Sequence, residues 1–128
     1  MTIETIMTKD DSGSELVKFA ENTAKTLVGN NLTRAQIRNI FTEVRKIEAS
    51  WDDENPGDSM RRLNMLKPKM DYQAARAKPV ELLRDVLRDA ITQVDAASGE
   101  ERNRRFRVFM DLFEAILAYH RAKGGRTN

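Results

Sequence analysis

Residues 66–76 have the sequence Leu66-Lys67-Pro68-Lys69-Met70-Asp71-Tyr72-Gln73-Ala74-Ala75-Arg76, in which two lysines flank a proline. One face of this stretch repeats at the 3.6-residue period of a helix and consists of Met70, Gln73, Ala74 and the following Ala77. Proline has no backbone N–H and a fixed φ, so we expect Pro68 to kink this helix or to divide it in two. The pattern predicts a helix that packs through one narrow face and presents Lys67, Lys69 and Arg76 outside it.

Helical periodicity continues on both sides of this stretch and predicts an all-α fold, a single compact bundle of about five helices. The expected helices begin at Ser14, Thr33, about Ser59, Pro79 and Ser98. No segment alternates apolar and polar residues for long enough to predict a strand. The inner faces of the helices form the expected core, which includes Ile37, Ile40, Phe41, Val44, Leu63, Leu83, Leu87, Phe109, Phe113 and Ile116.

Several helix starts carry residues that are typical of N-terminal caps. Thr33 and Gln36 have the spacing of a capping box, in which each side chain binds the backbone N–H of the other residue. Ser98 and Glu101 have the same spacing. Ser14 is the expected N-cap of the first helix, because its hydroxyl can accept a hydrogen bond from the first turn.

The loop at residues 52–58 is acidic and resembles a calcium-binding loop in composition. An EF-hand loop needs a glutamate at its twelfth position, and neither Asp52 nor Asp53 is followed by one at that spacing. We therefore expect a solvated linker without metal, in which Asp58 or Ser59 caps the next helix.

The chain is expected to consist of three segments. Residues 1–13 are polar and show no sustained period, which predicts a flexible N-terminal arm. Residues 14–125 form the helical domain. Gly124-Gly125 ends the last helix, and residues 126–128 are expected to fray.

Composition narrows the class of protein. A chain of 128 residues with 40% hydrophobic residues can form one domain with its own core. It contains no cysteine, which excludes disulfides and thiol chemistry. No apolar run approaches the ~20 residues of a membrane helix, and the N-terminal residues lack the apolar core of a signal peptide. We expect a cytoplasmic protein that does not contact a membrane.

Charge is distributed unevenly along the chain. Residues 1–30 carry three lysines against five acidic residues, whereas residues 31–128 carry 19 basic residues against 15 acidic ones. Of these 19 basic residues 14 are arginines, whose planar guanidinium groups match the geometry of phosphate. This balance permits an RNA partner without requiring one.

The sequence lacks the residue sets of common active sites. His120 is the only histidine, and it lies near the end of an apolar stripe, where a packed histidine is more common than a catalytic one. No set of His, Asp and Glu has the spacing of metal ligands, and no glycine-rich loop follows a strand to hold phosphate. We expect no enzyme activity, no metal and no cofactor, which leaves a binding or scaffolding role.

Three segments together resemble a known family. They are Leu32-Thr33-Arg34-Ala35-Gln36-Ile37-Arg38-Asn39, the stretch at residues 66–76, and Phe113-Glu114-Ala115-Ile116-Leu117-Ala118-Tyr119. Their order and spacing, with Gly-Gly after the third, resemble the small "belly" subunit of the type III-A CRISPR effector, the Csm complex. The resemblance covers roughly residues 32–125, and the middle segment is the most specific. Asp71 and Ala75 stand where the family pattern has Ala and Gly.

The resemblance implies a compact helical subunit without an active site of its own. Copies would stack into a filament beside the subunits that hold the guide RNA, and would line the groove of the guide–target duplex. The implied partners are the guide RNA, mainly the target RNA, other Csm subunits and copies of the chain itself. Target cleavage and nucleotide signalling would belong to other subunits.

Base pairing supplies the sequence specificity of guided effectors, so the protein is expected to contact the RNA backbone and its shape. The candidate RNA-binding residues are Lys67, Lys69, Arg76, Arg34 and Arg38. A second patch, for RNA or for a neighbouring subunit, consists of Arg102, Arg104, Arg105 and Arg107. Tyr72 could stack on a splayed base, but we expect it to pack against the protein.

Two other classes of function stay open. One is a helical adaptor that associates with itself and other proteins without contacting RNA. Measuring binding to single-stranded RNA at low and high salt distinguishes this adaptor from an RNA-binding subunit. The other is a DNA-binding regulator with residues 33–48 as a recognition helix, which the long acidic loop at residues 52–58 argues against.

Overall fold

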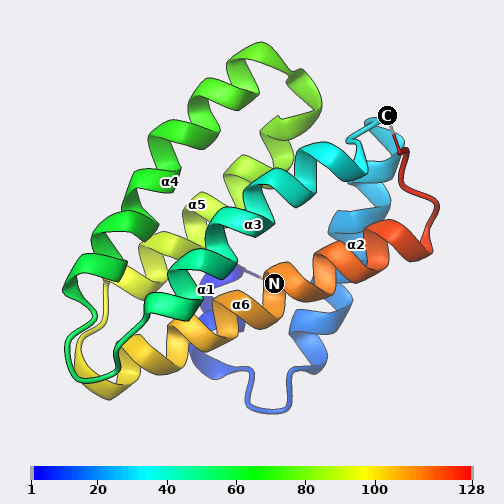
Figure 1. Ribbon diagram of the computed structural model, residues 1–128. Coiled ribbons are helices and arrows are strands. Elements are labelled where there is room, and N and C mark those ends of the chain that lie inside the picture. The colour runs from blue at the N-terminus through cyan, green and yellow to red at the C-terminus, as the bar shows by residue number, and fades with distance from the viewer. Residues whose placement is uncertain (1, 128) are drawn as a thin grey trace.

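The computed structural model describes residues 2–127 and contains six α-helices and one short 3₁₀-helix, η1 (Figure 1). Their bounds are α1 Ile3–Lys9, α2 Ser14–Gly29, α3 Arg34–Ser50, α4 Gly57–Arg76, η1 Lys78–Val80, α5 Glu81–Asp95 and α6 Gly99–Ala122. No strand occurs within the described residues, although Thr33 and Arg126 form an isolated bridge. The all-α prediction is confirmed, with six helices in place of about five. Met1 and Asn128, the ends of the predicted arm and frayed tail, lie outside the described residues.

The longer helices are arranged around α6. In Figure 1, α3, α4 and α6 run along the same diagonal, and α2 packs against α6 at one side. α6 is 24 residues long and contacts α1, α2, α3 and α5, which makes it the central helix. α4 contacts α3 and α5, and so lies at the outside of the bundle.

The core is built mainly from aromatic and branched aliphatic side chains. The residues predicted to form it are all buried except Phe41, which is half-buried. The Phe41 ring meets the Phe113 ring edge-on, with centroids 5.1 Å apart and an angle of 84° between the planes. The Arg45 guanidinium lies 5.8 Å from the centroid of Phe41. Phe41 therefore closes the edge of the core, and the prediction that it is buried is wrong.

The segment predicted as a flexible arm, residues 1–13, contains α1. The hydroxyl of Thr2 accepts a hydrogen bond from the backbone N–H of Thr5 (3.2 Å) and caps this helix. Ile6 and Met7 are buried, and α1 packs against α5 and α6. A helix this short is unstable alone, so its order comes from packing, which a search for sustained periodicity does not detect.

α4 runs without interruption through Pro68. The alternative that this proline divides the helix is wrong. Pro68 is exposed, so the carbonyl that loses its N–H partner can bind water, and the buried face of Leu66, Met70 and Ala74 is kept. The next helical segment is η1, and Pro79 occupies one of its first positions, which the fixed φ of proline favours.

The cap of α3 is the one that was predicted. Gln36 N donates to Thr33 Oγ1 (3.1 Å), and Thr33 N donates to Gln36 Oε1 (2.9 Å), which is a complete capping box. In the turn before it, Asn31 has a φ of 68°, a left-handed conformation that asparagine tolerates. The start of α3 is therefore fixed locally.

The other predicted caps are wrong. α6 has no side-chain cap at Ser98, and the Glu101 carboxylate, the other half of the predicted box, is bound by Arg104 and Arg105 instead. Ser14 does not cap α2. That role falls to Asp10, whose carboxylate accepts from the backbone N–H groups of the first turn, at 3.2 Å and 2.8 Å.

The acidic loop at residues 52–58 is mostly exposed, as expected of a solvated linker, and its first residues are anchored to α6. Trp51 Nε1 donates to Asn103 Oδ1 (2.9 Å), and Asn103 Nδ2 donates to the Asp53 carbonyl (2.9 Å). α4 then starts at Gly57 without a side-chain cap, so neither Asp58 nor Ser59 fills that role. The Ser59 hydroxyl instead binds the end of α3.

Residues 124–127, which we name the C-terminal strap, are tied to the start of α3. Arg34 donates from its backbone N to the Arg126 carbonyl (2.6 Å) and from Nε to the Gly125 carbonyl (2.9 Å). His120 is fully buried, and its Nε2 lies 2.8 Å from the Leu32 carbonyl oxygen. Gly125 packs so closely on the imidazole that a Cβ would collide with it. The prediction that the chain frays from residue 126 is wrong for Arg126.

Candidate nucleic-acid interface

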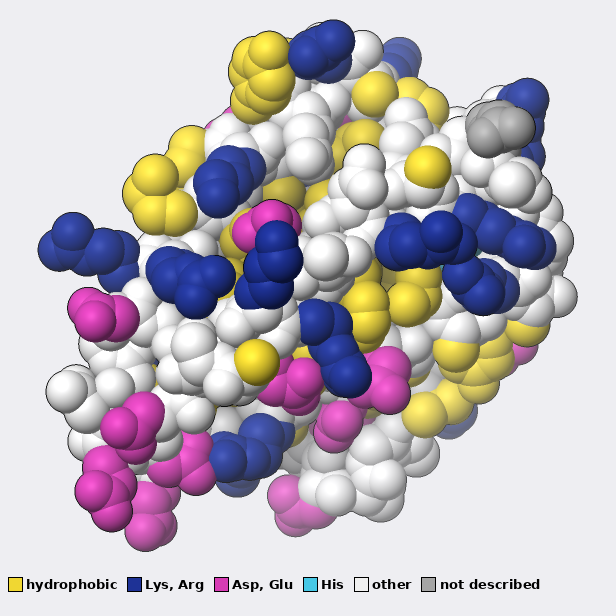
Figure 2. All heavy atoms as spheres, in the orientation of Figure 1, with side chains coloured by type: hydrophobic (Ala, Val, Ile, Leu, Met, Phe, Trp, Pro, Cys, Tyr) yellow, Lys and Arg dark blue, Asp and Glu magenta, His cyan; other side chains and the backbone are white. Residues whose placement is uncertain are grey.

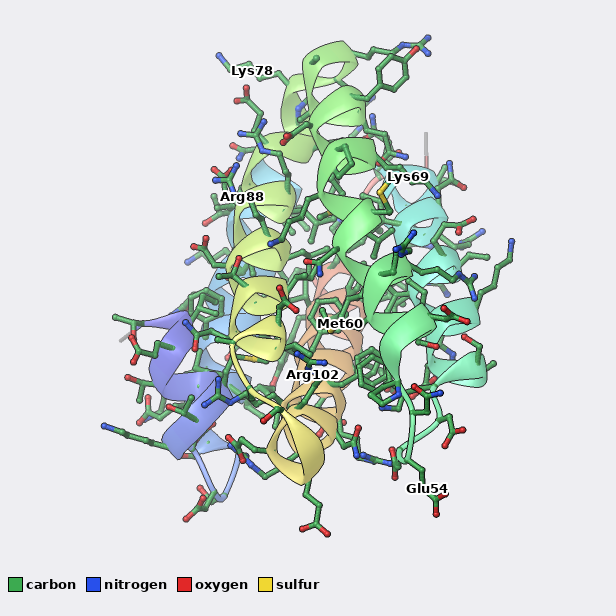
Figure 3. The ribbon with its side chains drawn as sticks, turned by 90° about the vertical axis from the view of Figure 1, so that its left-hand side faces the viewer. Glu54, Met60, Lys69, Lys78, Arg88 and Arg102 are labelled. Atoms are coloured by element: carbon green, nitrogen blue, oxygen red, sulfur yellow. The ribbon has the colours of Figure 1, made fainter. Side chains whose placement is uncertain are left out.

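A groove of about 1030 Å³ lies between α3 and α4. α3 lines it mainly with polar side chains, which include Gln36, Asn39 and Thr42, and α4 contributes Met65, Lys69, Tyr72, Gln73 and Arg76. Figure 3 shows Lys69 extending from α4 on the side that faces α3. The groove combines amides, an aromatic ring and two basic side chains.

Tyr72 is the most exposed large hydrophobic residue within residues 2–127, with 63% of its surface exposed. The Arg76 guanidinium lies 5.7 Å from the centroid of its ring, and Arg76 Nη1 donates to the Tyr72 hydroxyl (3.4 Å). The prediction that Tyr72 packs against the protein is wrong, since its position on α4 faces away from the core.

Lys67 and Lys69 point to different sides of α4. Two residues along a helix correspond to a rotation of about 200°, so neighbours in the sequence are separated in space. Lys67 Nζ donates to Thr92 Oγ1 on α5 (3.1 Å), whereas Lys69 lines the groove toward α3. The structure therefore brings Lys69 and Arg76 together and places Lys67 elsewhere.

Arg34 and Arg38 lie on the first two turns of α3. Arg34 is half-buried and holds the C-terminal strap, whereas Arg38 is exposed. Neither lines the groove. Figure 2 shows basic side chains spread across this face of the molecule, while acidic ones gather mainly at its lower left, where the connection between α3 and α4 turns.

The four arginines at the start of α6 are occupied by partners within the chain. The ion pairs are Arg102 with Asp95 (3.7 Å), Arg104 with Glu101 (2.9 Å), Arg105 with Glu101 (2.8 Å) and Arg107 with Asp53 (2.7 Å). Hydrogen bonds from Arg104 and then from Arg105 lower the pKa of Glu101 from 4.5 to about 2. The structure does not gather these arginines into a patch of unpaired charges.

The amides of the groove were not predicted as site residues. Gln36, Asn39 and Gln73 are small polar residues on helices and carry no charge pattern that singles them out. A signal was present in α3, where Gln36, Asn39 and Glu43 recur at helical spacing along one flank of the apolar face. Only the packing of α3 beside α4 shows that these amides line the same groove as Tyr72.

No group of three or more His, Cys, Asp or Glu side chains in residues 2–127 is placed to hold a metal ion. The same residues contain no helix that is long and apolar enough to cross a membrane.

A comparison with protein families identifies the family of this all-α bundle. The family model described as Csm2 Type III-A matches residues 10–126. The chain belongs to the Csm2 type III-A family. As a Csm2 protein it is a small subunit of the Csm complex, the type III-A CRISPR effector, and associates with other Csm subunits. Comparisons with curated proteins and with solved structures gave no match.

Proposed function

We propose that this Csm2 protein is a non-catalytic RNA-binding subunit that stacks with copies of itself along the guide–target duplex and contacts mainly the backbone of the target RNA. The pairing of guide and target carries the sequence information, so the subunit needs only contacts that tolerate any sequence. Lysine and arginine contacts to phosphate have this property, and their strength depends on salt.

The observation that carries the proposal is the pair of basic residues on the groove. Lys69 and Arg76 are exposed, and neither takes part in an ion pair within residues 2–127. The four arginines at the start of α6, by contrast, are each paired with an acidic residue of the same chain. An unpaired basic pair beside an exposed aromatic ring is the usual composition of a surface that binds single-stranded RNA.

The test is the salt dependence of RNA binding by the double variant Lys69→Gln, Arg76→Gln. If both residues contact phosphate, the slope of log affinity against log salt on single-stranded RNA falls in magnitude by about 1.4, or about 0.7 per contact. The matched control is Lys18→Gln, Lys25→Gln, which removes the same charge from exposed positions on α2, away from the groove. An equal change in both variants would mean that net charge alone is responsible.

The remaining candidates are tested in the same assay, one variant at a time. They are Lys67, Arg34 and Arg38, and then the second patch of Arg102, Arg104, Arg105 and Arg107. We expect smaller effects from the second patch, because RNA would have to replace existing ion pairs there. If the folded chain assembles with other Csm subunits but does not bind single-stranded RNA at low salt, the protein is an adaptor without RNA contact.

The proposed absence of catalysis has its own test. The only histidine, His120, is buried, and its ring is covered by Gly125. We expect no cleavage of RNA by the purified chain with magnesium or manganese. Cleavage that persists through repurification and disappears in His120→Ala would contradict the proposal.

A further inference from the structure

The groove between α3 and α4 contains an exposed aromatic ring and several amides, which contacts to two phosphates would not need. This inference rests on the proposed function and deepens it. We propose that the groove receives one unstacked base of the RNA, which stacks on Tyr72 and presents its edge to the amides of Asn39 and Gln73.

The argument begins with the exposure of Tyr72. A ring that leaves 63% of its surface in water contributes little to the stability of the bundle. Met65 lies two turns earlier on the same helix, lines the same groove and is 52% exposed. Single exposed apolar residues are common, but two of them in one groove form a surface on which a base can stack.

The second step concerns the hydrogen-bonding groups that line the same groove as this ring. Gln36 uses its Oε1 to cap α3, which leaves its amide N–H groups available. The amides of Asn39 and Gln73 make no hydrogen bond to another described residue. An amide offers a donor and an acceptor side by side, which is the arrangement that the edges of bases recognise.

The third step concerns charge. Lys69 precedes Tyr72 by three residues and Arg76 follows it by four, so the two basic side chains flank the ring along about 10 Å of helix axis. They are placed to meet the phosphates on either side of a base that lies on Tyr72. The acidic Glu43 at the groove is already paired with Lys46 (3.5 Å). Two basic side chains on either side of an exposed ring therefore suit a nucleotide, whose flat base lies between two phosphates, better than an apolar helix, which would leave both charges without a partner.

The test compares Tyr72→Ala with Tyr72→Phe in the full-length chain, with single-stranded RNA that contains one 2-aminopurine. Loss of one stacked base should weaken binding about 5- to 150-fold in Tyr72→Ala, while Tyr72→Phe keeps most of the affinity. The salt slope should be unchanged in both, because no charge is removed. The fluorescence of 2-aminopurine should be quenched by the wild type and by Tyr72→Phe, and not by Tyr72→Ala.

A fully paired RNA duplex is the control ligand, because its bases are not available, and Tyr72→Ala should bind it like the wild type. Wild-type affinity and quenching in Tyr72→Ala, with the slope still reduced by Lys69→Gln, Arg76→Gln, would overturn the base site and leave the proposed function standing. Failure of the wild type to bind RNA would overturn both. If Tyr72→Ala instead breaks association between copies and leaves RNA binding unchanged, the groove is a protein interface.

Discussion

Replacing Phe113 by alanine removes a fully buried ring from the central helix and tests the packing of the whole bundle. A Phe→Ala change in a core costs about 3–5 kcal/mol, which combines lost burial with the cavity that remains. The edge-on contact with Phe41 accounts for about 0.5–1.5 kcal/mol of interaction beyond burial. For a chain of this length the entropy of unfolding is about 0.27 kcal/mol/K, so we expect Tm to fall by roughly 11–19 °C.

The assay is urea unfolding followed by far-UV circular dichroism, supported by thermal melts. Val17→Ala on α2 is the control, because Val17 is 44% exposed and its loss should change stability by no more than about 0.5 kcal/mol. A double-mutant cycle with Phe41→Leu isolates the contact between the rings. A loss below about 1 kcal/mol for Phe113→Ala would refute the assigned orientation of α6.

Three further outcomes are expected. Because folding lowers the pKa of Glu101 from 4.5 to about 2, its ionised form stabilises the fold above pH 4.5, and this contribution is lost as the pH falls toward 2. An NMR titration should place its midpoint near 2, and a midpoint near 4.5 would contradict the ion pairs. Gly125→Ala should destabilise the protein by about 1–3 kcal/mol through collision with the imidazole, and should speed hydrogen exchange at Arg34 N. Its control, Gly29→Ala, has open space and should be neutral or slightly stabilising in the same exchange and melting experiments. Pro68→Ala should stabilise the fold by about 2 kcal/mol in urea unfolding, because alanine restores a helix hydrogen bond, and a loss of stability would show that the proline is needed in α4.

Much of the fold follows from local sequence signals. The start of α3 is specified by Thr33 and Gln36, which lie in one turn, and the buried positions follow the helical period. α1 was not predicted, because this short helix is ordered by its contacts with α5 and α6 and not by a periodic pattern of its own. The capping box predicted at Ser98 does not form. The Glu101 carboxylate accepts hydrogen bonds from arginines instead, and these are stronger than a hydrogen bond from a backbone N–H.

The candidate site was only partly predictable. Lys69 and Arg76 were identified from the sequence, but Lys67 was grouped with them by proximity along the chain, which a helix does not preserve. The partner of Arg107 is Asp53, in a loop distant in sequence, so its pairing becomes visible only in three dimensions. Residue type supplied the candidates, and packing decided which of them share a surface.

The packing of α2 against α6 has a consequence for how the chain is made. Residues 30–98 separate the two helices, so the ribosome must synthesise most of the protein before α2 can bury its apolar face. The last residues of the strap then supply the acceptor for the first amide of α3. Contacts this distant in sequence are formed late and slow the folding of a helical protein relative to one built from local contacts. During synthesis the apolar face of α2 therefore stays uncovered until α6 has been made, and uncovered apolar surface favours aggregation.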